Sequence, residues 1–416
     1  MQHPLINLVK DKEFLLSLSE KNGTPLFVYD KTIMQDNLLS VDKALKSNFD
    51  DYHICYTIKA NNNPMVIKAL KCALPTLGAD CSSPGDIHAA KLGGIDSSDC
   101  IFTGNYESED DLKIAYKNGT HINLDDISSF SRLIKIGIPK EISFRLNPGF
   151  GKGAFSQVVT GGKNSKFGVP KENIVEAYMF AKENGVKKFG IQCMTGSGVM
   201  DTNYFSLLMK EILNTVKRIS DKVKIEFKHI SIGGGYGIPY RENESPLDYN
   251  QIFNKVSNVF HNYFQDGNKP SLWIEPGRSI VGNSALLLSK VTGIKNSYKR
   301  YIGLEAGMET LMRPALYGAY HRIYKVGDPY GSLTQNVDFT GRICENTDRI
   351  AVNRSFTDIE ENDLVAIMDV GAYGYVMSHQ FCTRPRSAEL MIDGKDHYLI
   401  RKKESIDDIF SNCILS

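Results

Sequence analysis

Short apolar runs alternate with amphipathic stretches over the first two thirds of the chain. The runs, rich in β-branched and aromatic residues, cover residues 52–59, 75–81, 100–104, 121–125, 141–148, 188–194, 229–236 and 271–278. Between them apolar residues recur with a helical period, most clearly on one face of 203–220 and one face of 249–264. Eight alternations of strand and helix predict a parallel (β/α)₈ barrel, which makes this an α/β protein.

After residue 278 the helical period disappears. Short strand-like runs separated by turns follow, at residues 284–294, 337–344, 363–374, 388–394 and 397–402. They predict a separate β domain. The segment TPLFVYD (24–30) resembles one more strand, and we expect it to complete that domain. The predicted barrel therefore spans 31–275, and the predicted β domain combines 1–30 with 276–416.

The composition of the chain indicates which binding partners and which cellular compartment to expect. A chain of 416 residues with 42% hydrophobic residues is long enough for two domains. Its net charge is +1 and no block of Lys or Arg stands out, which disfavours nucleic acid and anionic membranes as partners. The N-terminus lacks the apolar segment of a signal peptide, no run is long enough to span a bilayer, and the eight cysteines are scattered. We expect a cytoplasmic protein with reduced thiols and no metal.

Polar residues and glycines follow the ends of the predicted strands. Catalytic groups of such barrels lie at the carboxyl ends of the strands, so these residues are expected to converge. They are Lys59, Asp80, Asn105, Asn147, Gly196 and Ser197, Gly233 to Gly235, and Glu275 with Arg278.

The lysine of YTIKANNNP (56–64) has two interpretations. Desolvated in the barrel mouth, Lys59 would have a lowered pKa and act as an amine nucleophile. It could equally be an ordinary lysine at a strand end with its ammonium in water.

The glycine motif and the carboxylate motif each have two interpretations as well. GGGYG (233–237) could present backbone N–H groups to an anion, helped by the hydroxyl of Ser197, or form only a tight turn. Glu275 could keep a heteroaromatic ring nitrogen protonated, or pair with Arg278. Both roles can coexist.

A set of motifs spread from about residue 24 to 410 matches one family. They are YTIKAN (56–61), LNPGFGKG (146–153), TGGKNSKFGV (160–169), HISIGGGYGIPY (229–240), WIEPGR (273–278), EAGMETLMRPALYGAYH (305–321), CENTD (344–348), GAYGYVMS (371–378) and FCTRPRSAEL (381–390). Together they resemble the pyridoxal-phosphate decarboxylases with an alanine-racemase-like barrel, and within them the diaminopimelate decarboxylases.

The resemblance implies a role for each matching position. Lys59 would bind the aldehyde of pyridoxal 5'-phosphate, and Glu275 would face its pyridine nitrogen. The other residues implied at the cofactor are Asp80, Met194, Ser197, Gly234, Gly235, Gly277, Arg278 and Tyr373. The substrate's distal end would be bound by Arg278, Arg313, Tyr317, Glu345 and Tyr373.

The resemblance also implies a homodimer with shared active sites. Cys344 and Glu345 would enter from a second subunit, where the cysteine would return a proton to Cα and the glutamate would contact the distal amine. Without the family, Cys344 would be interpreted as a small buried apolar residue.

Some positions depart from the family pattern. GIQCMTGSG (190–198) has Gln192 and Met194 where the family has histidines, the second of which stacks on the cofactor ring. HQFC (379–382) replaces a form of S-N-Y-N, and Glu305 replaces an aspartate. A methionine thioether can still cover a ring face, but it supplies no imidazole.

The leading hypothesis is decarboxylation of meso-diaminopimelate to L-lysine, the last step of lysine biosynthesis. The departures motivate a second: a related decarboxylase acting on another carboxylated amino acid, such as a carrier-tethered or siderophore precursor. An inactive paralogue would be expected to lack Lys59 or Cys344. A racemase would need a second base facing Cα.

Overall fold

The computed structural model describes residues 2–265 and 269–414. The chain forms two compact units. One, which we call the barrel unit, consists of residues 36–238 and 246–279; the other, the β unit, consists of 1–35, 239–245 and 280–416. The sequence pattern had no signal for the short excursion 239–245, which joins the β unit from within the barrel segment.

Eight parallel strands close into a barrel, as the sequence pattern predicts. In chain order they are β2 (Tyr52–Thr57), β3 (Gly78–Cys81), β4 (Cys100–Thr103), β5 (His121–Leu124), β6 (Glu141–Asn147), β8 (Lys188–Gln192), β9 (Phe227–Ser231) and β10 (Ser271–Ile274). The two-residue strand β7 (Val169–Pro170) adds to β6. Pairing between β5 and β6 and between β10 and β2 completes the ring, so the sheet has no free edge.

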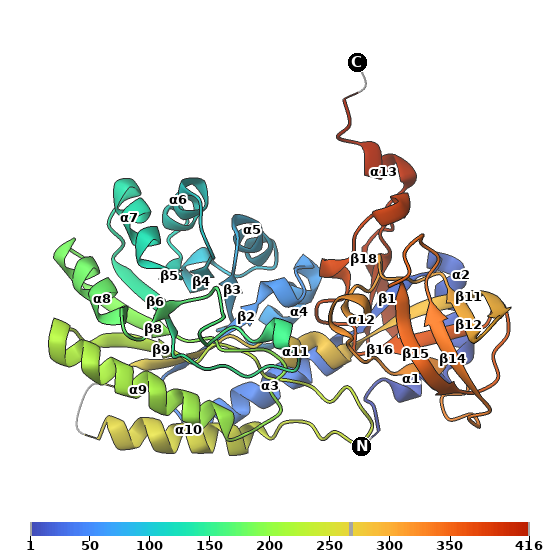
Figure 1. Ribbon diagram of the computed structural model, residues 1–416, viewed down its shortest axis with the longest axis horizontal. Coiled ribbons are helices and arrows are strands. Elements are labelled where there is room, and N and C mark those ends of the chain that lie inside the picture. The colour runs from blue at the N-terminus through green and yellow to red at the C-terminus, as the bar shows by residue number, and fades with distance from the viewer. Residues whose placement is uncertain (1, 266–268, 415–416) are drawn as a thin grey trace. The chain divides into compact units, whose positions relative to one another are not determined.

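Helices surround the strands in alternation with them (Figure 1). They are α3 (Lys31–Lys46), which begins in the β unit, α4 (Pro64–Ala73), α5 (Pro84–Leu92), α6 (Glu109–Lys117), α7 (Ile127–Ile136), α8 (Ile174–Glu183), α9 (Tyr204–Val223) and α10 (Tyr249–Tyr263). The predicted apolar face of α9 is buried, from Phe205 to Ile219. Burial of these faces against the strands stabilises the barrel.

Short polar residues define where several helices begin. The side chain of Asn63 accepts a hydrogen bond from the Met65 backbone N–H at the start of α4, and Pro64 occupies the first helical position. Ser108 forms a capping box with Asp111 at the start of α6. The asparagine and proline after Lys59 therefore end the strand segment and start a helix.

The amino end of the barrel is filled by aromatic and imidazole rings. Trp273 on β10 stacks on His229 of β9, with ring centroids 4.2 Å apart. His53 of β2 and His121 of β5 approach the same indole, with centroid distances of 5.0 and 4.8 Å. Rings from three other strands thus meet on Trp273 at the end opposite the candidate site.

The β unit contains a mixed sheet of nine strands. They are β1 (Leu26–Asp30), β11 (Ala285–Asn296), β12 (Arg300–Leu304), β13 (Ile323–Lys325), β14 (Gln335–Thr340), β15 (Arg349–Phe356), β16 (Leu364–Met368), β17 (Ala388–Asp393) and β18 (Asp396–Arg401). The α-helices of this part are α1 (Ile6–Lys10), α2 (Lys12–Asn22), α12 (Arg313–Tyr317) and α13 (Ile406–Phe410), and α11 (Arg278–Val281) begins in the barrel unit and ends in the β unit.

The N-terminal strand completes this sheet, as predicted. β1 pairs with β11 in antiparallel orientation and with β17 in parallel orientation. Val28 lies opposite Leu286 on one side and Leu390 on the other, and all three belong to the unit's hydrophobic core. A strand from the start of the chain is therefore central to a domain built mostly from its end.

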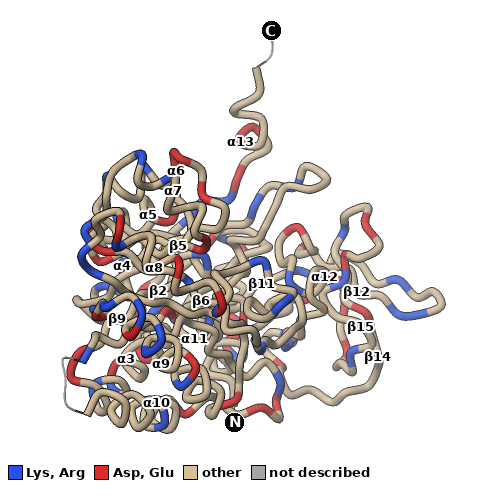
Figure 2. The backbone as a smooth tube through the Cα atoms, turned by 60° about the vertical axis from the view of Figure 1, so that its left-hand side comes forward, with Lys and Arg blue, Asp and Glu red and all other residues tan. Residues whose placement is uncertain are grey.

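Basic and acidic residues are interspersed along the described backbone, in keeping with the near-zero net charge (Figure 2). Within the described residues, no helix combines the length and apolar character needed to cross a bilayer.

Candidate active site

Lys59 lies just beyond the carboxyl end of β2. The strand ends at Thr57, and Ile58–Ala60 form a 3₁₀ turn. The Lys59 ammonium is 3.0 Å from an Asp80 carboxylate oxygen and 3.1 Å from the Ser82 hydroxyl. Its side chain is 47% exposed. The turn carries the side chain past the strand end, where it is half-exposed and pairs with Asp80.

Asp80 supplies a buried carboxylate at the end of β3. Its side chain is only 3% exposed. One oxygen pairs with Lys59, whereas Oδ1 is buried and has no hydrogen-bond partner among the described residues. A buried carboxylate oxygen without a donor is costly unless a further group meets it.

Glu275 immediately follows β10 and is held by two neighbouring strands. One carboxylate oxygen accepts a hydrogen bond of 2.6 Å from the Ser231 hydroxyl, and the other accepts one of 2.8 Å from the Gln192 amide. Burial raises the pKa of Glu275 to about 7, with a further rise from the charge of Asp80, against the hydrogen bonds and Lys59. The carboxyl group is therefore fixed in orientation and able to hold or release a proton near neutral pH.

Glycines let the backbone close tightly around this end of the barrel. Gly233 and Gly235 follow β9 with φ of +67° and +93°, where side chains are disfavoured. A Cβ on Gly234 would lie 2.1 Å from the Glu275 carbonyl oxygen, and one on Gly277 would lie 2.9 Å from the Thr57 and Ala60 side chains. The predicted glycine loop is thus packed against the strand that carries Glu275.

Ser197 and Arg278 meet beside this loop. Arg278 directs a guanidinium nitrogen to within 3.3 Å of the Ser197 hydroxyl. The glycine-rich insert 149–168 lies against the same segment, because Ala154 N–H donates to the Ser197 carbonyl at 2.8 Å and Ser197 N–H donates to the Val158 carbonyl at 3.1 Å. The insert therefore lies across the end of β8.

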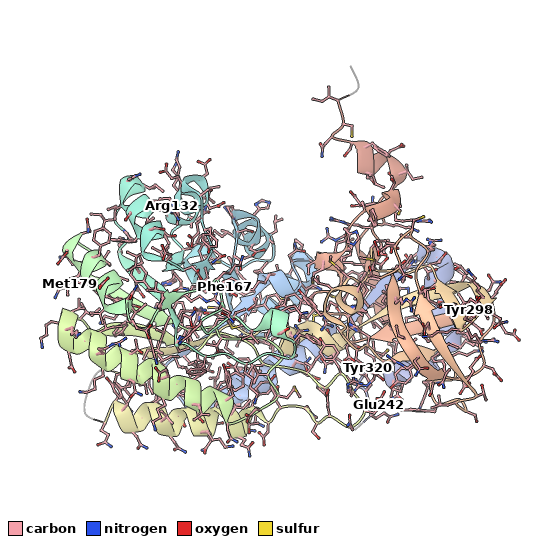
Figure 3. The ribbon with its side chains drawn as sticks, viewed as in Figure 1. Arg132, Phe167, Met179, Glu242, Tyr298 and Tyr320 are labelled. Carbon is pink, nitrogen blue, oxygen red and sulfur yellow. The ribbon has the colours of Figure 1, made fainter. Side chains whose placement is uncertain are left out.

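Met194, at the position of the family's ring-stacking histidine, lies next to the glycine loop. Its methyl carbon is 3.8 Å from where a Cβ on Gly235 would be. Its carbonyl accepts hydrogen bonds from Arg145 at 2.9 Å and Thr160 at 3.1 Å. Arg145 also stacks on Phe167 of the insert, with its guanidinium carbon 4.4 Å from the ring centroid. Phe167 is labelled in Figure 3. The thioether is therefore placed at the same barrel end as Lys59 and Glu275.

The remaining predicted residues lie in the β unit, in three places. Arg313 and Tyr317 are on the one-turn helix α12, with Arg313 only 1% exposed. Tyr373 lies in the turn after β16 with φ of +56°. Cys344 and Glu345 are exposed in the loop between β14 and β15. That loop borders a groove of about 720 Å³ that Glu345 lines.

The β unit also contains two of the positions that differ from the family pattern, residues 379–382 and Glu305. Within 379–382, Phe381 and Cys382 belong to a 3₁₀ turn (Phe381–Thr383), and both are exposed. Glu305 accepts a hydrogen bond from the Thr24 hydroxyl, next to the N-terminal strand.

Neither polar partner of Glu275 was assigned to the site from the sequence, and Gln192 was noted only as replacing a family histidine. Ser231 and Gln192 are the last residues of β9 and β8, and both are at most 1% exposed. A polar residue at the end of an apolar strand was the available signal, but only the register between β8, β9 and β10 shows which carboxylate it meets.

The barrel end fits a phosphorylated pyridine aldehyde. Lys59 offers an amine, Glu275 a buried carboxyl group for a ring nitrogen, and the glycine loop a close backbone approach for a phosphate. The buried Oδ1 of Asp80 is an acceptor that still needs a donor. These features match pyridoxal phosphate in chemistry.

Comparisons with known proteins point the same way. The family described as pyridoxal-dependent decarboxylase, pyridoxal binding domain, matches residues 36–282. The diaminopimelate decarboxylase of Methanothermobacter thermautotrophicus is 35% identical over 412 residues, covering 96% of each chain. That of Archaeoglobus fulgidus is 34% identical, covering 94% of this chain and 92% of the relative.

A solved structure agrees over the whole fold. The diaminopimelate decarboxylase of Helicobacter pylori, complexed with L-lysine, superposes with a TM-score of 0.88 at 28% identity, covering 95% of this chain and 98% of the other. The chain therefore belongs to the pyridoxal-dependent decarboxylases, among the diaminopimelate decarboxylases.

Proposed function

We propose that this protein decarboxylates meso-diaminopimelate to L-lysine and CO₂, using pyridoxal 5'-phosphate. The observation that carries the proposal is the grouping of Lys59, Asp80 and Glu275 at the glycine-lined end of the barrel. The relatives named above are diaminopimelate decarboxylases, which favours this substrate over the other carboxylated amino acids considered from the sequence.

The barrel unit would hold the cofactor. Lys59 would bind its aldehyde, and Glu275 would face its ring nitrogen beside Asp80. Its phosphate would meet Ser197, Arg278 and the backbone of Gly234, Gly235 and Gly277, with Tyr373 adding a hydroxyl, and Met194 would cover the ring. Bound there, the cofactor supplies an electron sink for the electrons released when the bond from Cα to the carboxylate breaks.

Glu275 would act by holding a proton at one fixed point. Ser231 and Gln192 each bind one of its oxygens, so the carboxylate cannot rotate away from the site. A pKa of about 7 allows it to share a proton with a ring nitrogen rather than remain a bare anion. A pyridine ring withdraws electrons more strongly when its nitrogen carries a proton, and Glu275 would supply that proton.

Arginines would select the substrate by the carboxylate that is not lost. Arg278, Arg313 and Tyr317 would bind this distal carboxylate, for which a planar guanidinium offers two parallel N–H donors. Because the product L-lysine keeps that carboxylate, the same residues would bind product.

A second copy of the chain would complete the site. Cys344 and Glu345 are exposed, as residues that serve a partner subunit must be before assembly. Hydrogen bonds from the Thr347 backbone and hydroxyl lower the pKa of Glu345, which keeps it ionised for an amine. In the proposed homodimer, Cys344 would return a proton to Cα and Glu345 would contact the distal amine.

We place the protein in the cytoplasm. All eight cysteines are free thiols, and four of them are buried. Such thiols suit a reducing compartment.

The test is CO₂ release by protein loaded with pyridoxal phosphate, measured for meso-diaminopimelate and for lysine, ornithine and arginine. We expect turnover of the first alone.

Borohydride reduction should leave a cofactor adduct on Lys59. Lys59→Ala should abolish the visible absorbance and the activity, whereas Lys68→Ala, an exposed lysine on α4, should change neither. Turnover of a different amino acid in place of meso-diaminopimelate would reject the substrate, and an unlabelled Lys59 would reject the site.

A further inference from the structure

Arg313 is the largest side chain that is fully buried in the described chain, and a histidine holds its guanidinium. One terminal nitrogen of Arg313 lies 2.8 Å from Nε2 of His321. The other ring nitrogen of His321, Nδ1, lies 2.7 Å from the carbonyl oxygen of Met368, the last residue of β16. His321 is 0% exposed, so water does not compete for either contact.

These two contacts determine the protonation of the ring. A guanidinium can only donate, so Nε2 must accept. A carbonyl can only accept, so Nδ1 must carry the proton. His321 is therefore a neutral imidazole protonated on Nδ1, and it links the Arg313 charge to the backbone of β16 through a single rigid ring.

Tyr240 fixes a second side of the same guanidinium. The Arg313 guanidinium carbon lies 4.8 Å from the centroid of the Tyr240 ring, within the range of a cation–π contact. Tyr240 belongs to the excursion 239–245 and is held by Arg322, which donates to the carbonyls of Pro239 at 3.1 Å and Arg241 at 2.7 Å. The excursion is thus what places an aromatic face over Arg313.

The backbone of His321 is secured as well. Arg354 on β15 donates to the His321 carbonyl at 3.1 Å. The same guanidinium lies 4.0 Å from the ring centroid of Tyr320, whose ring Arg241 also approaches at 4.3 Å. The backbone that carries the His321 ring is therefore held in place by β15 and by the neighbouring Tyr320.

We propose that His321 is a positioning residue for carboxylate recognition: it holds the Arg313 guanidinium in the one orientation that accepts the substrate's distal carboxylate. This inference rests on the proposed function, and in particular on Arg313 as a carboxylate ligand. An arginine held in advance loses less rotamer freedom when its ligand binds, so His321 acts on affinity for the carboxylate. It has no contact with the reacting bond in this role, so its effect is on KM more than on kcat.

The test compares two ligands of the cofactor-loaded protein that differ only in the carboxylate. L-Lysine carries it, and 1,5-diaminopentane does not. His321→Phe keeps the ring volume but removes the acceptor, and we expect it to weaken L-lysine binding about tenfold, as loss of a hydrogen bond to a charged group would. Binding of 1,5-diaminopentane should stay within about twofold, since it makes no bond of this kind. KM for meso-diaminopimelate should rise while kcat changes little.

Two further variants separate positioning from folding. His321→Gln keeps an acceptor and a donor on one side chain and should recover part of the L-lysine affinity. His397→Phe, the same replacement on β18 in the same unit, should leave both affinities unchanged. Equal losses for both ligands in His321→Phe would overturn the proposal, as would full L-lysine affinity in that variant.

A measurement independent of activity completes the test. Nitrogen chemical shifts of histidine-labelled protein should show His321 as the neutral form protonated on Nδ1, identified by its loss in His321→Gln. A ring protonated on Nε2 or on both nitrogens would overturn the proposal. If wild-type protein neither binds L-lysine nor turns over meso-diaminopimelate, the proposed function fails instead, and the shifts still report the His321 linkage.

Discussion

At the scale of single residues, the candidate site depends on how the pKa of a buried carboxyl group is kept near neutrality. Glu275 is 5% exposed and has Asp80 as a charged neighbour, and both conditions favour its protonated form. Ser231 and Gln192 favour the ionised form by donating to it. The balance of these opposing effects leaves the pKa of Glu275 near neutrality, which burial alone would not do.

This balance makes the stability of the cofactor-free protein depend on pH. The pKa of Glu275 is about 7 in the folded protein against an ordinary value of 4.5, so the folded state binds more protons between these two values. Its contribution to the free energy of unfolding is therefore present below pH 4.5 and is lost, by about 3 kcal/mol, as pH rises through 7.

Urea unfolding of wild type and Glu275→Gln between pH 5 and 8 isolates this effect, because other groups titrate equally in both. The stability of the variant relative to wild type should increase with pH and level off above pH 7. A difference that does not vary with pH would show that the carboxyl group is not protonated when buried.

The sequence indicated the charged residues of the site better than their neutral partners. Lys59, Asp80 and Glu275 each follow an apolar run, and the structure has all three at one end of the barrel. Ser231 and Gln192 end strands too, but nothing in one strand shows what a hydroxyl or amide will meet. The neutral state of His321 depends on contacts with Arg313 and Met368, which are eight and 47 positions away along the chain.

At the scale of elements, the carboxyl end of the barrel is built by backbone segments that approach more closely than side chains allow. The glycine loop after β9 packs on the segment after β10, and the insert 149–168 packs on the segment after β8. Gly196 shows the same constraint, since a Cβ there would lie 1.6 Å from the Lys152 carbonyl oxygen. Glycine at these positions is a steric requirement of the assembled loops.

Gly234→Ala should disturb both stability and the cofactor site. The added methyl group would overlap the Glu275 carbonyl, so we expect a loss of about 1–3 kcal/mol in the free energy of unfolding, typical of overpacking. Pyridoxal phosphate affinity should fall as the loop shifts, measured by absorbance titration. Gly85→Ala in α5, where a Cβ would be 3.5 Å from the Ser83 hydroxyl, is the matched control and should keep wild-type affinity. Wild-type affinity in Gly234→Ala would contradict the proposed phosphate site.

Element prediction was more complete in the barrel than in the β unit. All eight predicted barrel strands are present, because strands buried on both faces have nearly continuous apolar runs. β12, β13 and β15 were not predicted. In β15 the adjacent Ile350 and Ala351 are both buried and the adjacent Val352 and Asn353 are both exposed, so strict alternation is lost, and positive φ at Asn353 interrupts its pairing. Such a strand is defined by its neighbours rather than by its own pattern.

At the scale of the whole molecule, the two units divide the proposed chemistry. The barrel unit would hold the cofactor, and the β unit would supply Arg313 and, from a second copy, Cys344. The exposed position of Cys344 makes the proposed sharing of sites directly testable.

Subunit mixing tests the shared site. Lys59→Ala and Cys344→Ala should each lose activity, the first completely. If Cys344 serves the partner's site, a heterodimer of the two variants contains one site with both residues intact, and random mixing should restore about a quarter of wild-type activity. The control replaces another exposed cysteine, Cys413. The Cys413→Ala variant should be fully active without mixing. No gain above the mean of the separate variants would mean that each site is complete within one chain.

The ring cluster at the amino end of the barrel gives the molecule an internal optical reporter. Trp273 is the only tryptophan of the chain, and it stacks on His229 within the barrel unit. Indole emission during denaturation therefore follows the barrel unit alone, whereas circular dichroism registers both units. Comparing the two midpoints in a single titration measures directly whether the halves of this protein melt together or in sequence, without a label or a truncated chain.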